Sequence, residues 1–316
     1  LFEMFFSIKR LYMIKNQKLA YIFALIAVFF WSTVASAFKL SLEYFTPLEL
    51  VLYAVLTSIL TLFLIIVYQN KLGLIKKHFK KNFFMILFLG LLNPFLEYIV
   101  LFEAYDILPV QEAQTINYTW ALMLTYLSIP LLKHKLHMTD FVAGLICYFG
   151  VLIIATKGAP FSLEFTNGYG VFLALLTTVF WSLYWIFNTK VKVDPVVGIF
   201  CNFLISLPFI LIYIAMTEGF KVPEVEGLFG AAYVGLFEMS ITFLFWLKAM
   251  NYTTSTTKIA NLIFIAPFLS LVLIYFIIKE EILFSTITGL VLIIVGLLIQ
   301  QSGAIKDKVK KRRFKT

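Results

Sequence analysis

Cysteine, histidine and charged residues are all scarce in this chain of 316 residues. Its two cysteines, Cys147 and Cys201, lie inside apolar runs, and neither stands in a CxxC spacing or beside a histidine. We interpret them as small buried hydrophobic residues, because a disulfide framework or a zinc site needs paired or clustered ligands. The three histidines, His78, His134 and His137, lie among charged residues in predicted loops. The sequence therefore predicts no metal site and no cofactor.

Charged residues form only 14% of the chain, whereas hydrophobic residues form 61%, and the mean hydropathy is +0.94. These values lie far from those of soluble domains. The apolar residues occur in blocks of about 20, the length that a helix needs to cross a hydrocarbon layer of about 30 Å. Backbone groups in lipid must bond internally, and runs such as 59–67 and 290–299 lack the alternation of barrel strands. The composition predicts an all-α membrane protein with the lipid bilayer as a partner.

We predict ten transmembrane helices joined by short connections. Breakers such as Pro47, Pro109, Gly158 and Pro195 lie between the apolar blocks. The predicted spans are 19–38, 48–68, 83–105, 111–132, 139–156, 170–189, 195–216, 228–248, 257–278 and 284–302.

Basic residues are distributed unevenly among the predicted loops. With the N-terminus inside, all but four of the 26 Lys and Arg residues fall in cytoplasmic segments; the exceptions are Lys39, Lys157, Lys221 and Lys279. The net charge of +9 and the basic tail at 306–315 would also suit nucleic acid. Basic residues beside transmembrane helices more often mark the cytoplasmic side, where they meet anionic lipid. We therefore expect a multi-pass cell-membrane protein with both termini in the cytoplasm and no nucleic-acid partner.

The second half of the chain echoes the first. Phe-Trp-Ser occurs at 30–32 and again at 180–182, and at a shift of 145 residues Gly90 meets Gly235, Ala104 meets Ala249 and Gly144 meets Gly289. Each half holds five helices, and an odd number places the second half in the opposite orientation across the membrane. We predict two inverted five-helix repeats at 19–157 and 158–303, after a cytoplasmic segment at 1–18 and before a basic tail at 304–316. This architecture is typical of transporters, with a binding site expected near the midplane between the repeats.

These repeats, each with Phe-Trp-Ser on its first helix, resemble the drug/metabolite transporter superfamily, EamA type. In the second repeat the similarity continues through 249–250, 260–262, 266–268, 279–281 and Gly289. The stretch EAQTINYTW at 112–120 is similar to a motif of the aromatic amino acid exporter subgroup, as are 181–184 and 245–250. The chain departs from that motif at Ala121, where a proline is expected, and has Lys135 where the second repeat has an acid. The resemblance implies export of amino acids or related metabolites.

Two glutamates lie deep inside predicted spans. By helical rise, Glu97 lies roughly 21 Å and Glu238 roughly 15 Å from its helix start, so neither side chain easily reaches an interface. An ionisable group in hydrocarbon is costly and usually faces a cavity or a partner. Asn93 with Glu97 and Glu238 with Thr242 form two i, i+4 pairs that coincide under the 145-residue shift. The carboxylates are candidates for binding a substrate amine or a coupling proton, and structural hydrogen bonds between helices are the alternative.

Polar and aromatic residues complete the predicted site. Gln114, Asn117 and Tyr118 share one helical face, which either lines a cavity or bonds helix to helix. Trp31 and Trp181 lie about 12 residues into their helices, too deep for an interfacial belt, and flat rings suit an aromatic or cationic substrate. The predicted substrate-binding residues are Trp31, Asn93, Glu97, Gln114, Asn117, Tyr118, Trp120, Trp181, Tyr184, Glu238, Thr242 and Trp246.

Charged residues near span ends and prolines inside spans have plainer interpretations. Lys39, Glu103, Lys248 and Lys258 are expected to snorkel towards water. Prolines that fall well inside their spans predict local kinks, either for gating or as ordinary features of membrane helices: Pro94, Pro208 and Pro267.

These observations favour a secondary transporter that moves a small molecule outward by alternating access through a central cavity. No match to G-x-x-x-x-G-K-[ST] is present, so the energy would come from a gradient, with proton coupling as one form. Two alternatives stay open. A membrane-embedded enzyme would need acids, histidines or a nucleophile gathered at one membrane face, and a channel would need a filter sequence or a ring of charges.

Overall fold

The computed structural model describes residues 15–133, 137–162 and 164–313, without the side chains of 256–257 and 301–313. The predictions that concern residues 1–14, His134, Lys135 and the end of the basic tail lie outside these ranges. Within them the regular secondary structure is helical, and no strand occurs. The all-α prediction is confirmed for the described residues.

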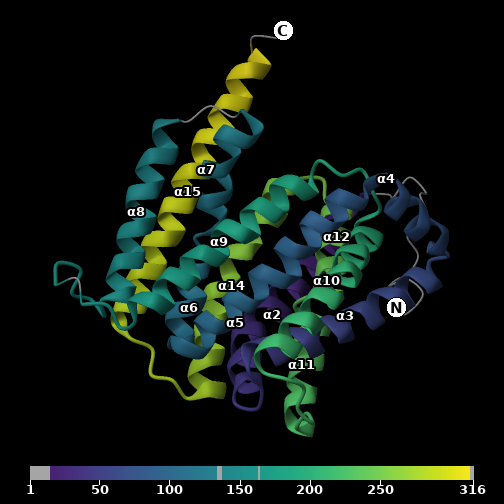
Figure 1. Cartoon of the computed structure of the whole chain (residues 1–316). Helices are drawn as coiled ribbons and strands as arrows, with labels where there is room; N and C mark the ends of the chain where they lie inside the picture. Colours follow the sequence, from purple (N-terminus) through teal and green to yellow (C-terminus); the bar gives the residue numbers. More distant parts are fainter. Residues whose placement is uncertain (1–14, 134–136, 163, 314–316) are drawn as a thin grey trace. The chain divides into compact units, whose positions relative to one another are not determined.

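The chain forms two compact units, and each unit combines segments from both halves of the sequence (Figure 1). Unit 1 comprises Leu1–Phe102 and Val191–Ile278, and unit 2 comprises Glu103–Lys190 and Lys279–Thr316. In unit 1 the helices and turns are α2 (Gln17–Leu42), α3 (Pro47–Tyr68), α4 (Leu72–Gly90), η1 (Leu91–Leu96), the start of α5 (Glu97–Ile107), α10 (Pro195–Thr217), α11 (Val225–Phe237), α12 (Ile241–Tyr252), α13 (Thr256–Ala260), η2 (Asn261–Ile265), α14 (Ala266–Leu273) and η3 (Ile274–Ile278). Unit 2 holds the end of α5 with α6 (Val110–Asn117), α7 (Trp120–Leu132), α8 (Met138–Ala155), α9 (Gly168–Asn188) and α15 (Phe284–Arg313).

Most of the predicted spans have the length and composition of membrane-spanning helices. Eight described helices or runs of successive helices meet both criteria: Gln17–Leu42, Pro47–Tyr68, Leu72–Ile107, Met138–Ala155, Gly168–Asn188, Pro195–Thr217, Val225–Tyr252 and Lys258–Ile278. Phe284–Gln300 is a shorter apolar helix, and the predicted span at 111–132 is divided between α6 and α7. A multi-pass membrane protein is confirmed, whereas the count of ten crossings stays a prediction.

The helix starts follow from local capping. Thr46 and Glu49 form a reciprocal capping box at α3, with Pro47 in the first turn. At α10 the Asp194 carboxylate accepts hydrogen bonds from the backbone N–H groups of Val196 (3.1 Å) and Val197 (3.4 Å). Such caps stabilise a helix by about 1 kcal/mol each.

One of the apolar cores of unit 1 lies between α3 and α10. Leu62, Ile65 and Ile66 of α3 form one buried cluster with Ile86 of α4 and with four residues of α10: Val196, Val197, Phe200 and Cys201. Cys201 belongs to this cluster, and Cys147 is buried in α8, so the prediction that both cysteines are buried is confirmed. Apolar burial of this kind contributes roughly 25 cal/mol per Å².

Two glycines related by the 145-residue shift make corresponding contacts inside unit 1. A Cβ atom at Gly90 of α4 would lie 2.5 Å from the carbonyl oxygen of Asn202 in α10. A Cβ atom at Gly235 of α11 would overlap the carbonyl oxygen of Ala54 and would lie 2.7 Å from the Cβ of Thr57, both in α3. Thr57 and Asn202 are themselves 145 residues apart. Each half therefore packs its third predicted span against the second span of the other half.

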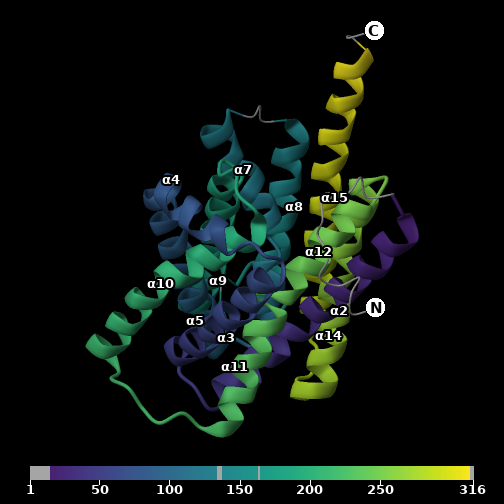
Figure 2. The ribbon, with the colours of Figure 1, turned by 90° about the vertical axis from the view of Figure 1, so that its right-hand side faces the viewer.

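In unit 2, α8 and α15 lie side by side in both ribbon views (Figures 1 and 2). A Cβ atom at Gly150 would lie 2.7 Å from the carbonyl oxygen of Gly289, and one at Gly289 would lie 2.6 Å from that of Gly150. Gly296 approaches the Cys147 sulfur in the same way. Small residues at these positions permit a close helix contact of the kind common in membranes.

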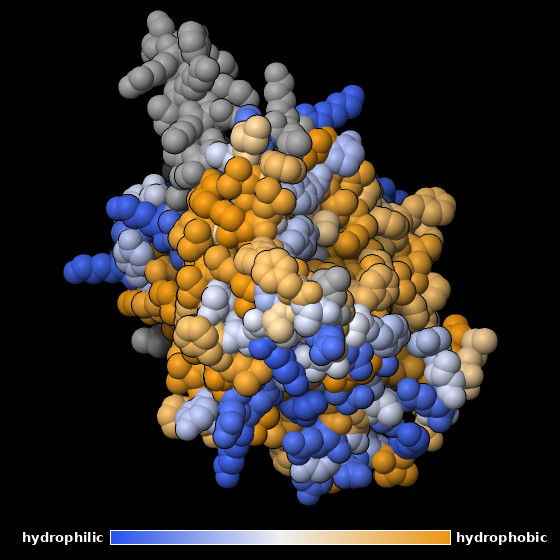
Figure 3. Space-filling model, turned by 90° about the vertical axis from the view of Figure 1, so that its left-hand side faces the viewer, coloured by the Kyte–Doolittle hydropathy of each residue, from blue (hydrophilic) through white to orange (hydrophobic). Residues whose placement is uncertain are grey.

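The outer surface carries large apolar side chains, as a lipid-facing surface requires. Phe141, Leu145 and Phe149 are exposed along one side of α8. Figure 3 shows a face on which hydrophobic side chains cover a broad area and hydrophilic side chains gather in the lower part.

Candidate functional site

Two helical runs of unit 1 are interrupted at positions that the 145-residue shift relates. Between α4 and α5, Asn93 leaves the helical region (φ −144°, ψ 121°) and Pro94 lacks a backbone N–H, so the chain forms the π-helical turn η1. Between α11 and α12, residues 238–240 form a turn in which Ser240 is not helical (φ −136°, ψ −81°). The irregularity predicted at Pro94 is confirmed. The prediction that Glu238 and Thr242 share one continuous helical face is wrong, because the helix is interrupted between them.

Hydroxyl groups satisfy the backbone at the second interruption. Ser58 of α3 lies 2.7 Å from the Ser240 hydroxyl and 3.3 Å from the carbonyl oxygen of Met239. The Ser240 hydroxyl donates to the Gly235 carbonyl at 2.7 Å, and that of Thr242 donates to the Phe237 carbonyl. A helix break in lipid needs such partners, because water is not at hand. The predicted residue Thr242 thus supports the break.

The interruptions bring the two deep glutamates together. Asn93 Nδ2 donates a hydrogen bond of 3.1 Å to Glu97 Oε2, and Tyr98 Oη donates one of 3.2 Å to Glu238 Oε1. Glu97 is 3% exposed and Glu238 is partly exposed. Because Tyr98 directly follows Glu97, its hydrogen bond to Glu238 places the two carboxyl groups in the same part of unit 1. Four polar side chains, three of them among the predicted residues, therefore form one cluster. We call its two acidic members, Glu97 and Glu238, the carboxyl pair.

The carboxyl pair has no cationic side chain bonded to it. Among the described residues, no Lys or Arg nitrogen lies within 4.0 Å of a carboxyl oxygen of Glu97 or Glu238, whereas Lys71 and Asp194 form an ion pair elsewhere in unit 1. Burying an unpaired charge is unfavourable, and burying two like charges side by side is more so. The arrangement suits a proton on one or both carboxyl groups, or a cationic ligand between them.

Aromatic rings of α2 pack against aromatic rings of α11 and α12 in unit 1. The rings of Trp31 in α2 and Trp246 in α12 lie 5.4 Å apart, and Trp31 also makes an edge contact with Phe243 at 5.7 Å. Phe30 stacks on Phe237, directly before Glu238, at 4.2 Å. Two predicted aromatic residues therefore meet each other, in contacts that a packing role also explains.

The other six predicted residues lie in unit 2, where several bond from helix to helix. Asn117 donates a hydrogen bond of 2.7 Å to Thr177, and Gln114 accepts one from Tyr105. These contacts match the helix-to-helix alternative for the polar face. Trp181 and Tyr184 both lie in α9, where their rings stack at 5.9 Å. The carbonyl oxygen of Trp120 accepts a hydrogen bond of 3.0 Å from Ser182 of α9, and Tyr118 directly follows α6.

The structure adds two polar residues that were not among the predicted site residues, and it corrects the prediction for a third. Tyr98 is buried beside the carboxyl pair, and its position directly after Glu97 is the signal that could have marked it. Glu112 is fully buried at the start of α6 and accepts a hydrogen bond of 3.1 Å from Thr166. The prediction that Lys248 snorkels to water is wrong, since this side chain is 7% exposed and its Nζ lies 5.3 Å from the centre of the Phe23 ring.

One histidine also differs from its prediction. His78 is buried within α4 and shares a hydrogen bond of 3.0 Å with Asn82. The predicted loop placement was wrong, because the lysines around His78 are the exposed side of a helix whose other side packs inward.

Comparison with known proteins extends these observations. The model of the EamA-like transporter family matches residues 18–156 and 168–300. An uncharacterized transporter of Clostridium kluyveri is 26% identical over 191 residues, which cover 58% of this chain and 60% of that protein's length. An uncharacterized transporter of Acidianus ambivalens is 26% identical over 201 residues, covering 63% of this chain and 77% of that protein. A solved crystal structure has the same fold, with a TM-score of 0.64 and 19% identity over 91% of this chain and 98% of that one.

Proposed function

The chain belongs to the EamA-like transporter family, and from the carboxyl pair of unit 1 we propose that it is a secondary transporter which exports small metabolites carrying an amino group, such as amino acids. Membership in a transporter family makes a membrane transporter the activity to explain. The substrate class, the direction and the mechanism are our proposal.

The carboxyl pair carries the proposal because it places two acidic side chains, one buried and one partly exposed, in one cluster without a cationic partner in the described residues. A substrate ammonium group placed between Glu97 and Glu238 would supply the missing positive charge and donate to both carboxylates. Asn93 and Tyr98 each donate to one oxygen of a carboxyl group, and so leave the other oxygen for the ligand. An ammonium group can donate three hydrogen bonds, which suits two acceptors approached at once.

Alternating access is supported by the internal repetition of the fold. The interruptions at 91–96 and 238–240 fall at related places in two halves that we propose to be inverted five-helix repeats, giving ten crossings with both termini in the cytoplasm. Discontinuous helices near the midplane are a recurrent source of binding groups in transporters. Rocking one part of the bundle against another would open the carboxyl pair to one side of the membrane at a time.

Proton coupling follows from the same two side chains. A carboxyl group that holds a proton cannot at the same time pair with an ammonium group as a carboxylate, so proton and substrate compete. Competition at one alternately accessible site is an antiport mechanism, in which an entering proton displaces the outgoing substrate. No nucleotide would be consumed.

Transport by reconstituted protein tests this proposal. Proteoliposomes containing the wild type, Glu97→Gln, Glu238→Gln or the exposed control Glu224→Gln would be assayed with radiolabelled amino acids, both under a pH gradient and in gradient-free exchange. Loss of the pH response with exchange retained in either pair variant assigns proton coupling to that residue. Loss of both the pH response and exchange in a pair variant indicates that the substituted residue binds the substrate amine. Unchanged transport in both pair variants would contradict the proposal.

The same assay separates the transporter from the other two classes. Saturable counterflow between two compartments excludes a channel, whereas turnover of substrate in detergent, without a second compartment, would indicate an enzyme. A C-terminal tag that is accessible from outside intact cells would overturn the proposed orientation.

A further inference from the structure

The first ten residues of α4 form a helical segment of their own. Asn82 departs from helical torsions (φ −131°, ψ 26°) and separates residues 72–81 from the rest of α4. Directly beyond it, Phe83, Phe84 and Phe88 are exposed, as side chains in lipid are. From this change in exposure we place residues 72–81 before the point at which α4 enters the hydrocarbon layer, at the level of the lipid headgroups.

One side of this segment is packed against the protein. Ile75 and Phe79 lie against the buried α3–α10 cluster. His78, on the same side of the segment, is buried and shares a hydrogen bond with Asn82. These contacts fix the rotation of the segment about its own axis.

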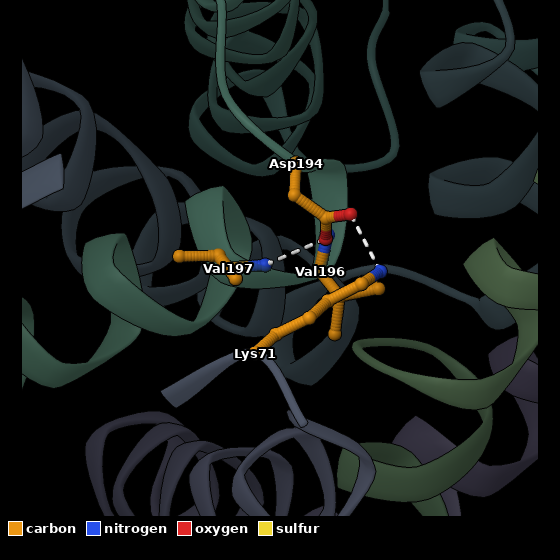
Figure 4. Close-up of polar contacts among 4 residues, drawn as sticks. All are labelled: Lys71, Asp194, Val196 and Val197. Atoms are coloured by element: carbon orange, nitrogen blue, oxygen red, sulfur yellow. Dashed lines mark hydrogen bonds and ion pairs between the residues drawn. The ribbon is translucent and has the colours of Figure 1, made fainter. Parts of the chain in front are cut away.

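The segment is also held at its start, as Figure 4 shows. Lys71 Nζ lies 2.6 Å from Asp194 Oδ2, while the other oxygen of the same carboxylate caps α10 through the N–H groups of Val196 and Val197. Lys71 and Asp194 are both largely buried at this contact. The segment is thus attached to α10 at residue 71 and again along its apolar side.

The opposite side carries four exposed lysines: Lys76, Lys77, Lys80 and Lys81. At about 100° per residue they cover an arc of about 140°, opposite the side that Ile75 and His78 bury. Leu72 and Leu74, which are also exposed, border this arc on its two edges. None of the four lysines forms an ion pair with an acid in the part of the chain that the structure describes.

We propose that this lysine face binds the phosphate groups of anionic phospholipids, with phosphatidylglycerol as the model ligand. Four unpaired ammonium groups on a fixed helix complement a layer of phosphates, and lysine stems can lie along apolar surface while their heads reach the phosphate level. The flanking leucines and the following phenylalanines supply apolar contacts for the acyl chains beside those headgroups. A soluble acidic partner would match the charge, but would leave this apolar border without a role.

Distance-dependent quenching tests the proposal in the full chain. Bimane would be attached to the cysteine of Leu74→Cys, an exposed position at the edge of the lysine face, and would report on the lipids beside that face. The native Cys147 and Cys201 are buried and should not react with the label. In liposomes, phosphatidylglycerol carrying a nitroxide near its headgroup should quench this label more strongly than phosphatidylcholine with the same nitroxide. The excess should disappear in the variant K76Q/K77Q/K80Q/K81Q and persist in K76R/K77R/K80R/K81R.

A matched control separates a site from general charge attraction. Replacing four other exposed lysines, as K190Q/K192Q/K221Q/K258Q, makes the same change in net charge and should retain the excess quenching. Equal quenching by the two lipids in the wild-type background would overturn the proposal. So would equal loss of the excess in the control variant, since that result indicates bulk electrostatics only.

Discussion

Tyr98 donates a hydrogen bond of 3.2 Å to Glu238, so the residue that follows one buried glutamate holds the other in place. Asn93 holds Glu97 in a comparable way from four residues earlier in the same helical run. The two side chains that hold these carboxyl groups therefore both come from the first half of the sequence.

Removing the Tyr98 hydroxyl should weaken substrate binding without abolishing transport. Tyr98→Phe keeps the ring in its buried position and removes one donor to Glu238, which we expect to lower substrate affinity by about fivefold, or about 1 kcal/mol. The measurement is the KM for counterflow in proteoliposomes. Tyr275→Phe, at an exposed position, should leave KM unchanged, and an unchanged KM in Tyr98→Phe as well would show that Tyr98 has no part in binding.

The crossed glycine contacts should be sensitive to a single methyl group. Gly90→Ala and Gly235→Ala each force a Cβ atom against backbone oxygen, and we expect each to lower the free energy of unfolding by about 1–3 kcal/mol. Gly73→Ala provides the matched control in α4, because its Cβ would meet nothing within 4 Å, and should be neutral or slightly stabilising. Thermal unfolding in detergent gives the comparison, and equal Tm values for the three variants would refute the packing argument.

The two roles of Asp194 can be separated by substitution. Asp194→Ser keeps a side-chain oxygen that can cap α10 but removes the charge that pairs with Lys71, whereas Asp194→Ala removes both. We expect the free energy of unfolding to be about 1 kcal/mol lower for Asp194→Ala than for Asp194→Ser. Measured Tm values should decrease in the order wild type, Asp194→Ser, Asp194→Ala. Added salt should reduce only the difference in Tm between the wild type and Asp194→Ser, because that difference includes the screened ion pair with Lys71.

The tryptophans distinguish binding from packing. If Trp31 contacts substrate, Trp31→Ala should reduce substrate affinity by more than the control Phe243→Ala, its neighbour in the same ring cluster. Equilibrium binding of a labelled amino acid, measured beside Tm for both variants, makes the comparison. Wild-type affinity combined with a lowered Tm in Trp31→Ala would assign this residue to packing.

Hydrophobic patterning predicted the helical spans well and their irregularities less well. The span 48–68 differs from α3 by one residue at its start, because a long apolar run bounded by a capping threonine leaves little choice. The extension of α4 back to Leu72 was missed, since its lysines suggest a loop unless one notes that residues 75, 78 and 79 recur at helical spacing. The turn at 238–240 was also missed, because it depends on Ser58, which comes from another helix.

The candidate site was predicted only in part, because sequence spacing reports on contacts within one helix and not on contacts between helices. The contact between Asn93 and Glu97 is local, and spacing alone anticipated it. The contact between Tyr98 and Glu238 depends on which helices become neighbours, and periodicity within one helix carries no information about that. Lys248 was mispredicted for the same lack of information about neighbours. A charged residue near a span end is expected at the interface, and the sequence does not show that Lys248 Nζ lies over the Phe23 ring of another helix.

The crossed packing of Gly90 on Asn202 and Gly235 on Thr57 has a consequence for biosynthesis. While the ribosome is still translating residues before 191, α4 has not yet met the helix against which it finally packs, and α3 lacks α10. The nascent first half must therefore wait in the bilayer, or beside the insertion machinery, as an incomplete bundle. A gene cut between the halves would yield two fragments that acquire native packing only when they are synthesised together.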